Sequence, residues 1–347
     1  MKKVIALVLV LLLVVPVFAG CGDGRTEVIL MNWGEYLDPE LIQQFEAENP
    51  DIKLTQRTTT SNEEMYVVCA TEGSEIDICV PSEYMVERMM NEGLLAEIDV
   101  SQLTNYEHIK TYAESRTFDP ESKYSIPYMV GTLGIVYNTT LVDDEVTSWD
   151  ILWNEKYSKQ LMMYNSIRDS LAVALLRLGY DINTTNPDEI EAAGQELIAQ
   201  KPLVLAYGTD NIKDSMIAGS CALAVDYSGA AAAAIMENPD LNYVVPEEGS
   251  NVWVDNLAIL ESSDNKEAAM RVLDFLCDPE VAAQNAEYIG YTPANTTAMD
   301  YVSDELKANP AFVIEDGVLD RCEYYTDLAE DDLEIYNDVW MKVQTAS

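Results

Sequence analysis

The sequence predicts an α/β protein built as two lobes that close on a ligand. Strand-like and helix-like segments alternate along the chain in two units. The sequence has no linker between the units and no catalytic motif. About 325 residues remain after the predicted signal peptide, more than one hydrophobic core usually supports. Apolar residues make up 48% of the chain, which excludes a disordered protein.

The first predicted unit alternates strands with helices. Asp38 caps its first helix and Pro39 takes the first helical position, while Ser61 and Glu64 have the spacing of a capping box in the second. Gly93 ends the third helix. The order predicts a mostly parallel sheet with ligands at the carboxyl ends of its strands. The segments are strand 27–31, helix 38–48, strand 52–57, helix 61–72, strand 76–80 and helix 84–92.

A second alternating unit follows Gly131. Ser228 and Gly229 begin a helix of small residues, for which we expect close packing against a sheet, and Asp278-Pro279 interrupts a long helical stretch. The predicted strands are 134–138, 161–164, 203–206, 222–226, 242–245 and 252–260. The predicted helices are 148–153, 168–178, 187–200, 228–234, 266–289, 303–308 and 332–343.

The first residues predict a secretion signal of the lipoprotein type. Lys2-Lys3 is followed by an apolar run over 4–19 and then by Gly20-Cys21. This run is shorter than the roughly 20 residues that a membrane-spanning helix needs. We therefore predict a signal peptide at 1–20, with Cys21 lipidated as the first mature residue. The protein would lie outside the cytoplasm, anchored to the cell membrane, and in the periplasm if the cell has an outer membrane.

Charge limits the class of partner. The formal net charge is −41, so nucleic acids and anionic lipid headgroups would be repelled, whereas a cationic ligand would be attracted. A solubility role spread over the whole surface is the alternative explanation of this charge.

Cysteine and histidine usage argue against a disulfide scaffold, a metal site and a nucleophilic enzyme. Five cysteines follow Cys21, an odd number, and no two have metal-motif spacing. His108 is the only histidine, which leaves no histidine cluster for a metal and no Ser-His or Cys-His pair without it. Nucleotide-binding glycine motifs are missing from the sequence as well. We predict no metal, no cofactor and no catalysis.

Aromatic rings recur beside carboxylates where strand-like runs end. Residues 32–36 hold two rings and a carboxylate, and 82–84, 253–255 and Tyr291 repeat this chemistry. An aromatic face attracts an ammonium group by about 0.5–2 kcal/mol, and a carboxylate supplies the counter-charge. The four fragments predict one pocket for an organic cation.

Eight motifs, which follow one another along the chain in the order given below, resemble those of the spermidine/putrescine-binding proteins of bacterial ABC importers. The resemblance implies a two-lobed periplasmic-binding-protein fold of type II, with two chain crossings and hinge closure around the ligand. Lobe I would comprise 26–132 plus 253–296, and lobe II 133–252 plus 297–347. The motifs are MNWGEY (31–36), SNEEMY (61–66), VPSEY (80–84), YSIPY (124–128), TSW (147–149), LGY (178–180), the segment 248–258 and IGY (289–291).

The resemblance also implies which residues bind the ligand. Five rings would line a slot for the methylene chain, and Asp255 and Asp169 would be salt-bridge partners of two ammonium groups. Asp169 begins a helix, where it can act as a cap instead. The implied ligand residues are Trp33, Glu35, Tyr36, Ser82, Tyr84, Asp169, Trp253, Asp255 and Tyr291.

A second set of candidates covers positions where this chain departs from the family pattern or leaves a role open. A glycine replaces a hydroxyl residue, a serine replaces an aspartate, an Asp-Tyr pair replaces Trp-Asn, and the polar position near the C-terminus is ambiguous. These departures leave the ligand length open. The candidates are Gly34, Glu83, Ser166, Asp226, Tyr227, Glu323 and Tyr325.

The predicted function is capture of a polyamine, putrescine or spermidine or both, and its delivery to the permease subunits of an ABC transporter by a monomeric binding protein. One alternative keeps the fold but changes the cargo to another organic cation, such as an amino acid or a thiamine-like compound. Another is a secreted hydrolase that uses Asp169 and Asp255 as paired carboxylates.

Overall fold

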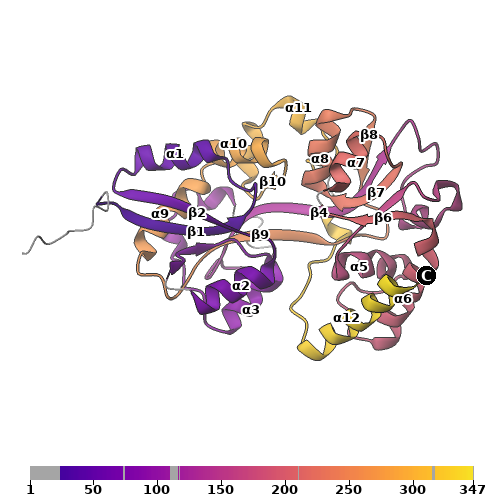
Figure 1. Ribbon diagram of the computed structural model, residues 1–347. Helices are drawn as coiled ribbons and strands as arrows, with labels where there is room; N and C mark the ends of the chain where they lie inside the picture. Colours follow the sequence, from indigo (N-terminus) through magenta and orange to yellow (C-terminus); the bar gives the residue numbers. More distant parts are fainter. Residues whose placement is uncertain are drawn as a thin grey trace, which may run out of the picture.

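Two α/β lobes are joined by long strands in the computed structural model. Strands β4 (Ile126–Asn138) and β9 (Val252–Ile259) run between the lobes (Figure 1). The predicted signal peptide and the lipidated Cys21 lie outside the described residues. These are residues 24–72, 75–109, 116, 118–209, 211–314 and 317–346.

The sheet of the first lobe has the strand order β2-β1-β3-β9-β4. Strand β1 pairs in parallel with β2 and β3, as predicted, whereas β9 runs antiparallel to both β3 and β4. The elements of this lobe are β1 (Thr26–Trp33), α1 (Pro39–Glu48), β2 (Ile52–Thr59), α2 (Asn62–Thr71), β3 (Ile78–Cys79), α3 (Glu83–Asn91), η2 (Val100–Gln102), η3 (Tyr106–His108), α9 (Lys266–Leu276), α10 (Pro279–Ile289) and β10 (Thr292–Pro293).

Alternate residues of β1 pack into different layers of the first lobe. Leu30 contributes to a core with α1 and α9, whereas Met31 contributes to a core with α2 and α3. Successive strand residues point to opposite faces, so the hydrophobic run of β1 is buried on both. This three-layer packing brings the carboxyl end of β1 to the centre of the molecule.

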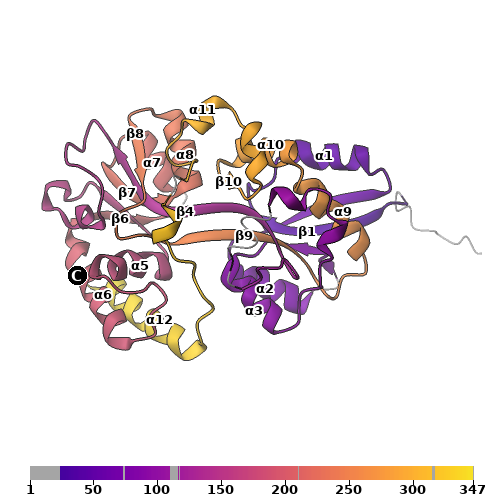
Figure 2. The same cartoon turned by 180° about the vertical axis from the view of Figure 1, so that it is seen from behind.

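The sheet of the second lobe has the order β4-β7-β5-β6, with β8 also paired to β4. Helices α5, α6 and α12 lie on one side of this sheet and α7 and α8 on the other (Figures 1 and 2). The elements are η4 (Trp149–Trp153), η5 (Glu155–Tyr157), β5 (Leu161–Tyr164), α5 (Ile167–Leu178), α6 (Pro187–Gln200), η6 (Lys201–Leu203), β6 (Val204–Gly208), α7 (Asn211–Ile217), β7 (Leu223–Tyr227), α8 (Ser228–Glu237), β8 (Leu241–Val244) and α12 (Glu330–Thr345).

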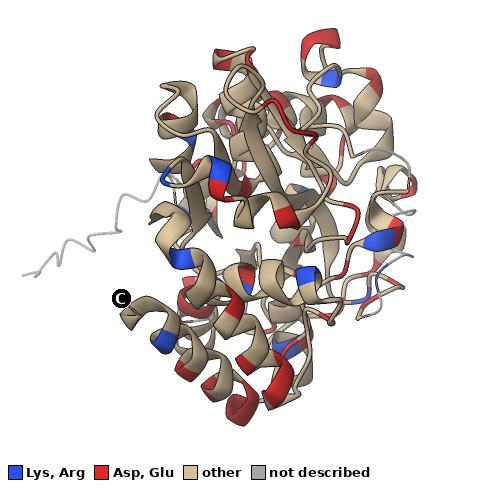
Figure 3. Ribbon diagram, turned by 90° about the vertical axis from the view of Figure 1, so that its right-hand side faces the viewer, with Lys and Arg blue, Asp and Glu red and all other residues tan. Residues whose placement is uncertain are grey.

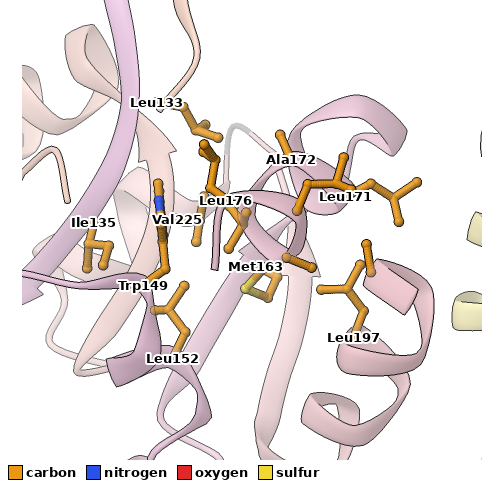
Figure 4. Close-up of a cluster of buried hydrophobic side chains, with 14 of the residues drawn as sticks. Leu133, Ile135, Trp149, Leu152, Met163, Leu171, Ala172, Leu176, Leu197 and Val225 are labelled. Carbon is orange, nitrogen blue, oxygen red and sulfur yellow. The ribbon is translucent and has the colours of Figure 1, made fainter. Parts of the chain in front are cut away.

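The second lobe has its own hydrophobic core. Trp149, Leu171 and Leu197 come from η4, α5 and α6 and belong to one cluster of buried side chains (Figure 4). The buried Trp149 Nε1 donates to the Gly249 carbonyl at 2.9 Å, which satisfies its one polar atom. This tryptophan is therefore structural.

The chain passes between the lobes three times. Strand β4 changes partner from β9 to β7 at Thr132 and Leu133, and the chain returns at the start of β9. A third passage follows β10 through η7 (Thr296–Asp300), α11 (Asp304–Lys307) and η8 (Leu319–Arg321), and it ends with α12 packed on α5 and α6.

Most helices and strands begin near the predicted residues. Asp38 and Ser61 cap α1 and α2 through side-chain hydrogen bonds, and Gly179 ends α5 with a φ of 77°. The first half of β4, β10 and α7 were missed, and β3 is shorter than expected.

Acidic side chains are spread over the helices of both lobes, with few basic residues between them (Figure 3). Within the described part of the chain, no helix is both long and apolar enough to span a membrane.

Candidate functional site

The first carboxylate of the site is Asp255 on β9. Its Oδ2 accepts a hydrogen bond from the Tyr36 hydroxyl at 2.7 Å, and its Oδ1 accepts one from Ser82 Oγ at 2.6 Å. Tyr36 follows β1, and Ser82 is the residue before α3, so the ends of two parallel strands deliver both donors. Asp255 is 5% exposed. A backbone bridge between Ser82 and Asp255 fixes this contact.

The second carboxylate is Asp169, in the first turn of α5. Its Oδ2 accepts from the Tyr227 hydroxyl at 2.8 Å and its Oδ1 from the Tyr325 hydroxyl at 3.1 Å. Ser166 caps the same helix and accepts from the Asp169 backbone N–H at 3.3 Å. Asp169 is 3% exposed. Tyr227 comes from the end of β7 and Tyr325 from the C-terminal tail, so three segments meet at this carboxylate.

A continuous path of rings joins the two carboxylates. Tyr36 contacts Tyr291 with ring centroids 5.9 Å apart, Tyr291 contacts Trp253 at 4.9 Å, and Trp253 contacts Tyr227 at 6.2 Å. All three pairs are edge-to-face. Tyr36 and Tyr227, the two ends of the path, donate to Asp255 and Asp169. Rings from three of the four predicted fragments therefore form, together with Tyr227, one aromatic strip that crosses from the first lobe to the second.

Two glycines make room for these rings. A Cβ on Gly131 of β4 would meet the Trp253 ring at 2.2 Å, and one on Gly229 of α8 would meet the Tyr291 ring at 2.3 Å. Any larger residue would displace a ring. Gly229 thus packs closely, as expected of a small-residue helix start, but its neighbour is a candidate ligand residue.

Burial raises the pKa of both site carboxyls. The pKa of Asp255 rises to about 6, against the lowering effect of its bonds from Ser82 and Tyr36. Burial also raises the pKa of Asp169, while the neighbouring side chains of Ser166, Tyr227 and Tyr325 lower it.

The tyrosine partners remain donors. Burial holds the pKa of Tyr36, Tyr227 and Tyr325 well above the usual tyrosine value, so their hydroxyls stay protonated and face the carboxylates.

Glu83, beside Ser82, is the third buried carboxyl in this region. It is 1% exposed, and its Oε2 accepts from the Val254 backbone N–H at 3.0 Å. Burial raises its pKa to about 8, the Val254 N–H opposes this, and the charge of Asp255 adds to it.

The remaining candidates lie at the margins of the strip. Trp33 is half-buried at the end of β1, whereas Gly34 and Glu35 just after it are exposed. Tyr84 packs against the cores of both lobes, and its hydroxyl donates to Glu63 at 3.1 Å.

Asp226 and Glu323 are the remaining two acidic candidates, and their side chains lie in different surroundings. Asp226 is buried on β7, and its Oδ1 accepts the Tyr227 backbone N–H. Burial, followed by the neighbouring Asp181 carboxylate, raises the pKa of Glu323 to about 7, so the Glu323 side chain lies beside Asp181.

Sequence reasoning missed two tyrosines that support the strip. The Tyr128 hydroxyl donates to the Tyr36 carbonyl at 3.2 Å and accepts from Asn285, which fixes the position of Tyr36. The Tyr164 ring packs edge-to-face on Tyr227 with centroids 4.9 Å apart. Tyr164 ends a strand-like stretch, the signal that located the other rings, whereas Tyr128 lies near the start of β4.

The arrangement suits an elongated cation with positive groups at both ends. Neither Asp255 nor Asp169 forms an ion pair with lysine or arginine among the described residues, although Arg168 stacks on Tyr325 at 4.4 Å. Buried carboxylates without a cationic partner are costly, and an ammonium group at each would offset this cost. The described residues also hold no group of three potential metal ligands.

Comparisons with known proteins agree with this chemistry. The sequence pattern of a family described as bacterial extracellular solute-binding protein matches residues 40–313. A spermidine/putrescine-binding periplasmic protein of Salmonella typhimurium is 36% identical over 315 residues, 90% of each chain. A putrescine/agmatine-binding protein of Pseudomonas aeruginosa is 26% identical over the full length of both chains.

Solved structures confirm the predicted fold. The crystal structure of a spermidine/putrescine ABC transporter substrate-binding protein from Streptococcus pneumoniae has a TM-score of 0.85 and 36% identity, with 93% of this chain and 99% of that one covered. A lipoprotein of Treponema pallidum has a TM-score of 0.83 and 26% identity, covering 91% of this chain and 99% of the other.

Proposed function

Since the chain belongs to the bacterial extracellular solute-binding protein family, we propose that it captures a polyamine, putrescine or spermidine, between its lobes and delivers it to an ABC permease. It is a solute-binding protein and not an enzyme, which sets aside the hydrolase alternative. It acts outside the cytoplasm.

One observation carries the choice of ligand. Two buried carboxylates, Asp255 and Asp169, are joined by a strip of rings and hydrogen-bonded by neutral hydroxyls. Each carboxylate supplies a counter-charge for one ammonium group, and the ring faces suit the methylene chain and its charged ends. The names of the relatives give spermidine, putrescine and agmatine as their ligands.

The ligand contacts extend along this strip. The proposed set comprises the two carboxylates, the rings and the neighbouring polar groups predicted from the sequence. Among these, Trp253 and Tyr291 would contact the methylene chain, because their rings lie midway along the path.

The proposal includes the membrane anchor and the domain division. Cys21 carries the lipid, so a Cys21→Ala form would be released from the membrane fraction. Lobe I takes 26–132 plus 253–296 and lobe II takes 133–252 plus 297–347, which separate hydrophobic cores support. The proposal also includes a monomeric protein.

Isothermal titration calorimetry of the protein starting after Cys21 tests the ligand class. Putrescine, cadaverine, spermidine and spermine are titrated, with arginine and thiamine as controls for other organic cations. We expect one-to-one binding of a polyamine and none of the controls. No detectable binding of any of the four polyamines, together with a cooperative thermal melt that shows a folded protein, would contradict the proposal.

A further inference from the structure

Beyond its pairing with β3, the same edge of β9 is covered by residues 81–83 and by the C-terminal tail. Backbone N–H groups of Val252, Val254 and Asn256 point to the same edge, because alternate residues of a strand share a direction. The Asn256 N–H donates to the Pro81 carbonyl at 2.9 Å, and the Val252 N–H donates to the Glu323 carbonyl at 3.0 Å. Pro81 belongs to the first lobe and Glu323 to the C-terminal tail.

Glu83 fills the gap between these two backbone partners. The middle N–H, that of Val254, donates to Glu83 Oε2 at 3.0 Å, so a side chain takes the place of a missing strand residue. The carboxyl is buried, and its second oxygen, Oε1, has no hydrogen-bond partner among the described residues. A buried, half-satisfied carboxyl is costly, which argues for a role beyond packing.

The neighbours of Glu83 belong to opposite ends of the ligand site. Ser82, the preceding residue, donates to Asp255. The backbone N–H of Tyr325 lies close enough to favour the ionised form of Glu83, and the Tyr325 hydroxyl donates to Asp169. Glu83 therefore lies between Ser82, which donates to Asp255, and Tyr325, which donates to Asp169.

We propose that Glu83 is a positioning residue of the ligand site. Its carboxyl group joins α3 of the first lobe to β9, whose Val252 N–H donates to Glu323 in the tail segment that carries Tyr325, and so holds the two ends of the site in register. This role rests on the proposed polyamine function. It requires an acceptor oxygen at this position and no direct contact between Glu83 and the ligand.

Three variants separate positioning from charge. Glu83→Ala removes the acceptor, and Glu83→Gln keeps an amide oxygen for the Val254 N–H while removing the ionisable group. Glu87→Gln, one turn further along α3, is the matched control for a charge change on the same helix. Binding of putrescine and spermidine is measured by calorimetry, and hydrogen exchange is resolved to single amides in the ligand-free protein.

Glu83→Ala should weaken the binding of both polyamines about tenfold, since a buried N–H loses its partner. Exchange of the Val254 amide should rise, while the Asn256 amide, bonded to Pro81, stays protected and serves as an internal control. Glu83→Gln should bind within about threefold of the unchanged protein and keep Val254 protected. Glu87→Gln should change neither measurement.

Three outcomes would overturn the proposal. These are unchanged affinity in Glu83→Ala, unchanged exchange at Val254 in that variant, or equal losses in the Ala and Gln variants, which would point to an ion pair with the ligand. If the Ala variant fails to fold, a folded Gln variant that loses affinity decides against it. If the unchanged protein binds no polyamine, the proposed function fails, and Val254 exchange still decides whether Glu83 joins these segments.

Discussion

The two carboxylates of the site have different surroundings, although each accepts two hydroxyl hydrogen bonds. Asp255 lies on a strand and has partners only from the first lobe. Asp169 lies in the first turn of α5, where the helix dipole favours a negative charge, and Arg168 lies next to it in the chain. The charge of Arg168 lowers the Asp169 pKa, whereas no such cation acts on Asp255.

This difference indicates which of the two carboxylates would depend more on the positive charge of the ligand. The second-lobe carboxylate is partly stabilised without a ligand, whereas the first-lobe carboxylate would depend more on the ammonium group of the proposed ligand. Asp255 should therefore contribute more to affinity than Asp169, even though both accept two hydrogen bonds of similar length.

The largest effect is expected from Asp255→Asn. A bound ammonium would lose its charged partner, which should cost about 2–4 kcal/mol, or roughly 30- to 1,000-fold in Kd. The melting temperature without ligand should change little. Calorimetry and thermal melts check both, with Asp264→Asn as an exposed control in the first lobe. A large melting loss with unchanged affinity would show that Asp255 is structural.

Asp169→Asn should weaken binding less, by about 1–2 kcal/mol, because the helix N-terminus and Arg168 already stabilise the charge that is removed. The same titrations, run side by side with Asp255→Asn, measure the ratio of the two losses. Equal or reversed losses would break the proposed asymmetry between the lobes.

The pH dependence of binding and of stability should have opposite signs. The folded-state pKa of Asp255 is raised to about 6, so between about pH 4 and 6 the folded protein holds a proton that the unfolded chain releases. Ligand-free stability should therefore fall as pH rises through this window. Glu83 acts in the same direction up to about pH 8.

Polyamine affinity should instead fall as pH drops below about 6, by up to about tenfold per pH unit, because an ammonium needs the ionised carboxylate. Melts with and without putrescine at pH 4.5, 6 and 7.5 check both signs. Asp255→Asn should flatten the binding profile. A profile that this variant leaves unchanged would assign the titration to another group.

The smallest effects are expected from the tyrosine donors. Tyr36→Phe and Tyr227→Phe each remove one hydrogen bond to a carboxylate and keep the ring, at a cost of about 0.5–1.5 kcal/mol in affinity. Tyr36→Phe should cost more, because Asp255 has fewer other stabilising groups. Titrations of both variants at pH 7.5 decide the order, and a larger loss for Tyr227→Phe would contradict the comparison.

The sequence located most of the fold because its signals are local. Pro39 after a capping Asp38 and Gly179 at a helix end act through residues within one turn. The first half of β4 was missed because Pro127 and Gly131 interrupt a strand-like pattern. Their places follow from pairing with β9 and from the space that the Trp253 ring needs.

In the candidate site, too, local patterns were readable from the sequence, whereas contacts between distant residues were not. Rings and carboxylates at strand ends were recognisable, because parallel strands bring their carboxyl ends to one edge. Glu35 belongs to the same fragment as Tyr36 but is exposed, whereas Glu83 is buried against β9. Both are carboxylates beside a ring, so the local pattern does not separate them.

The sequence by itself determined the class of the protein: an acidic, secreted, two-lobed α/β chain with rings and carboxylates at its strand ends. Only the tertiary structure decided which hydroxyl serves which carboxylate, the order of the rings and the third passage of the chain. Tyr36 is 219 residues from Asp255, and Tyr325 is 156 from Asp169. Backbone preferences act over a few residues, whereas such contacts depend on how whole layers pack.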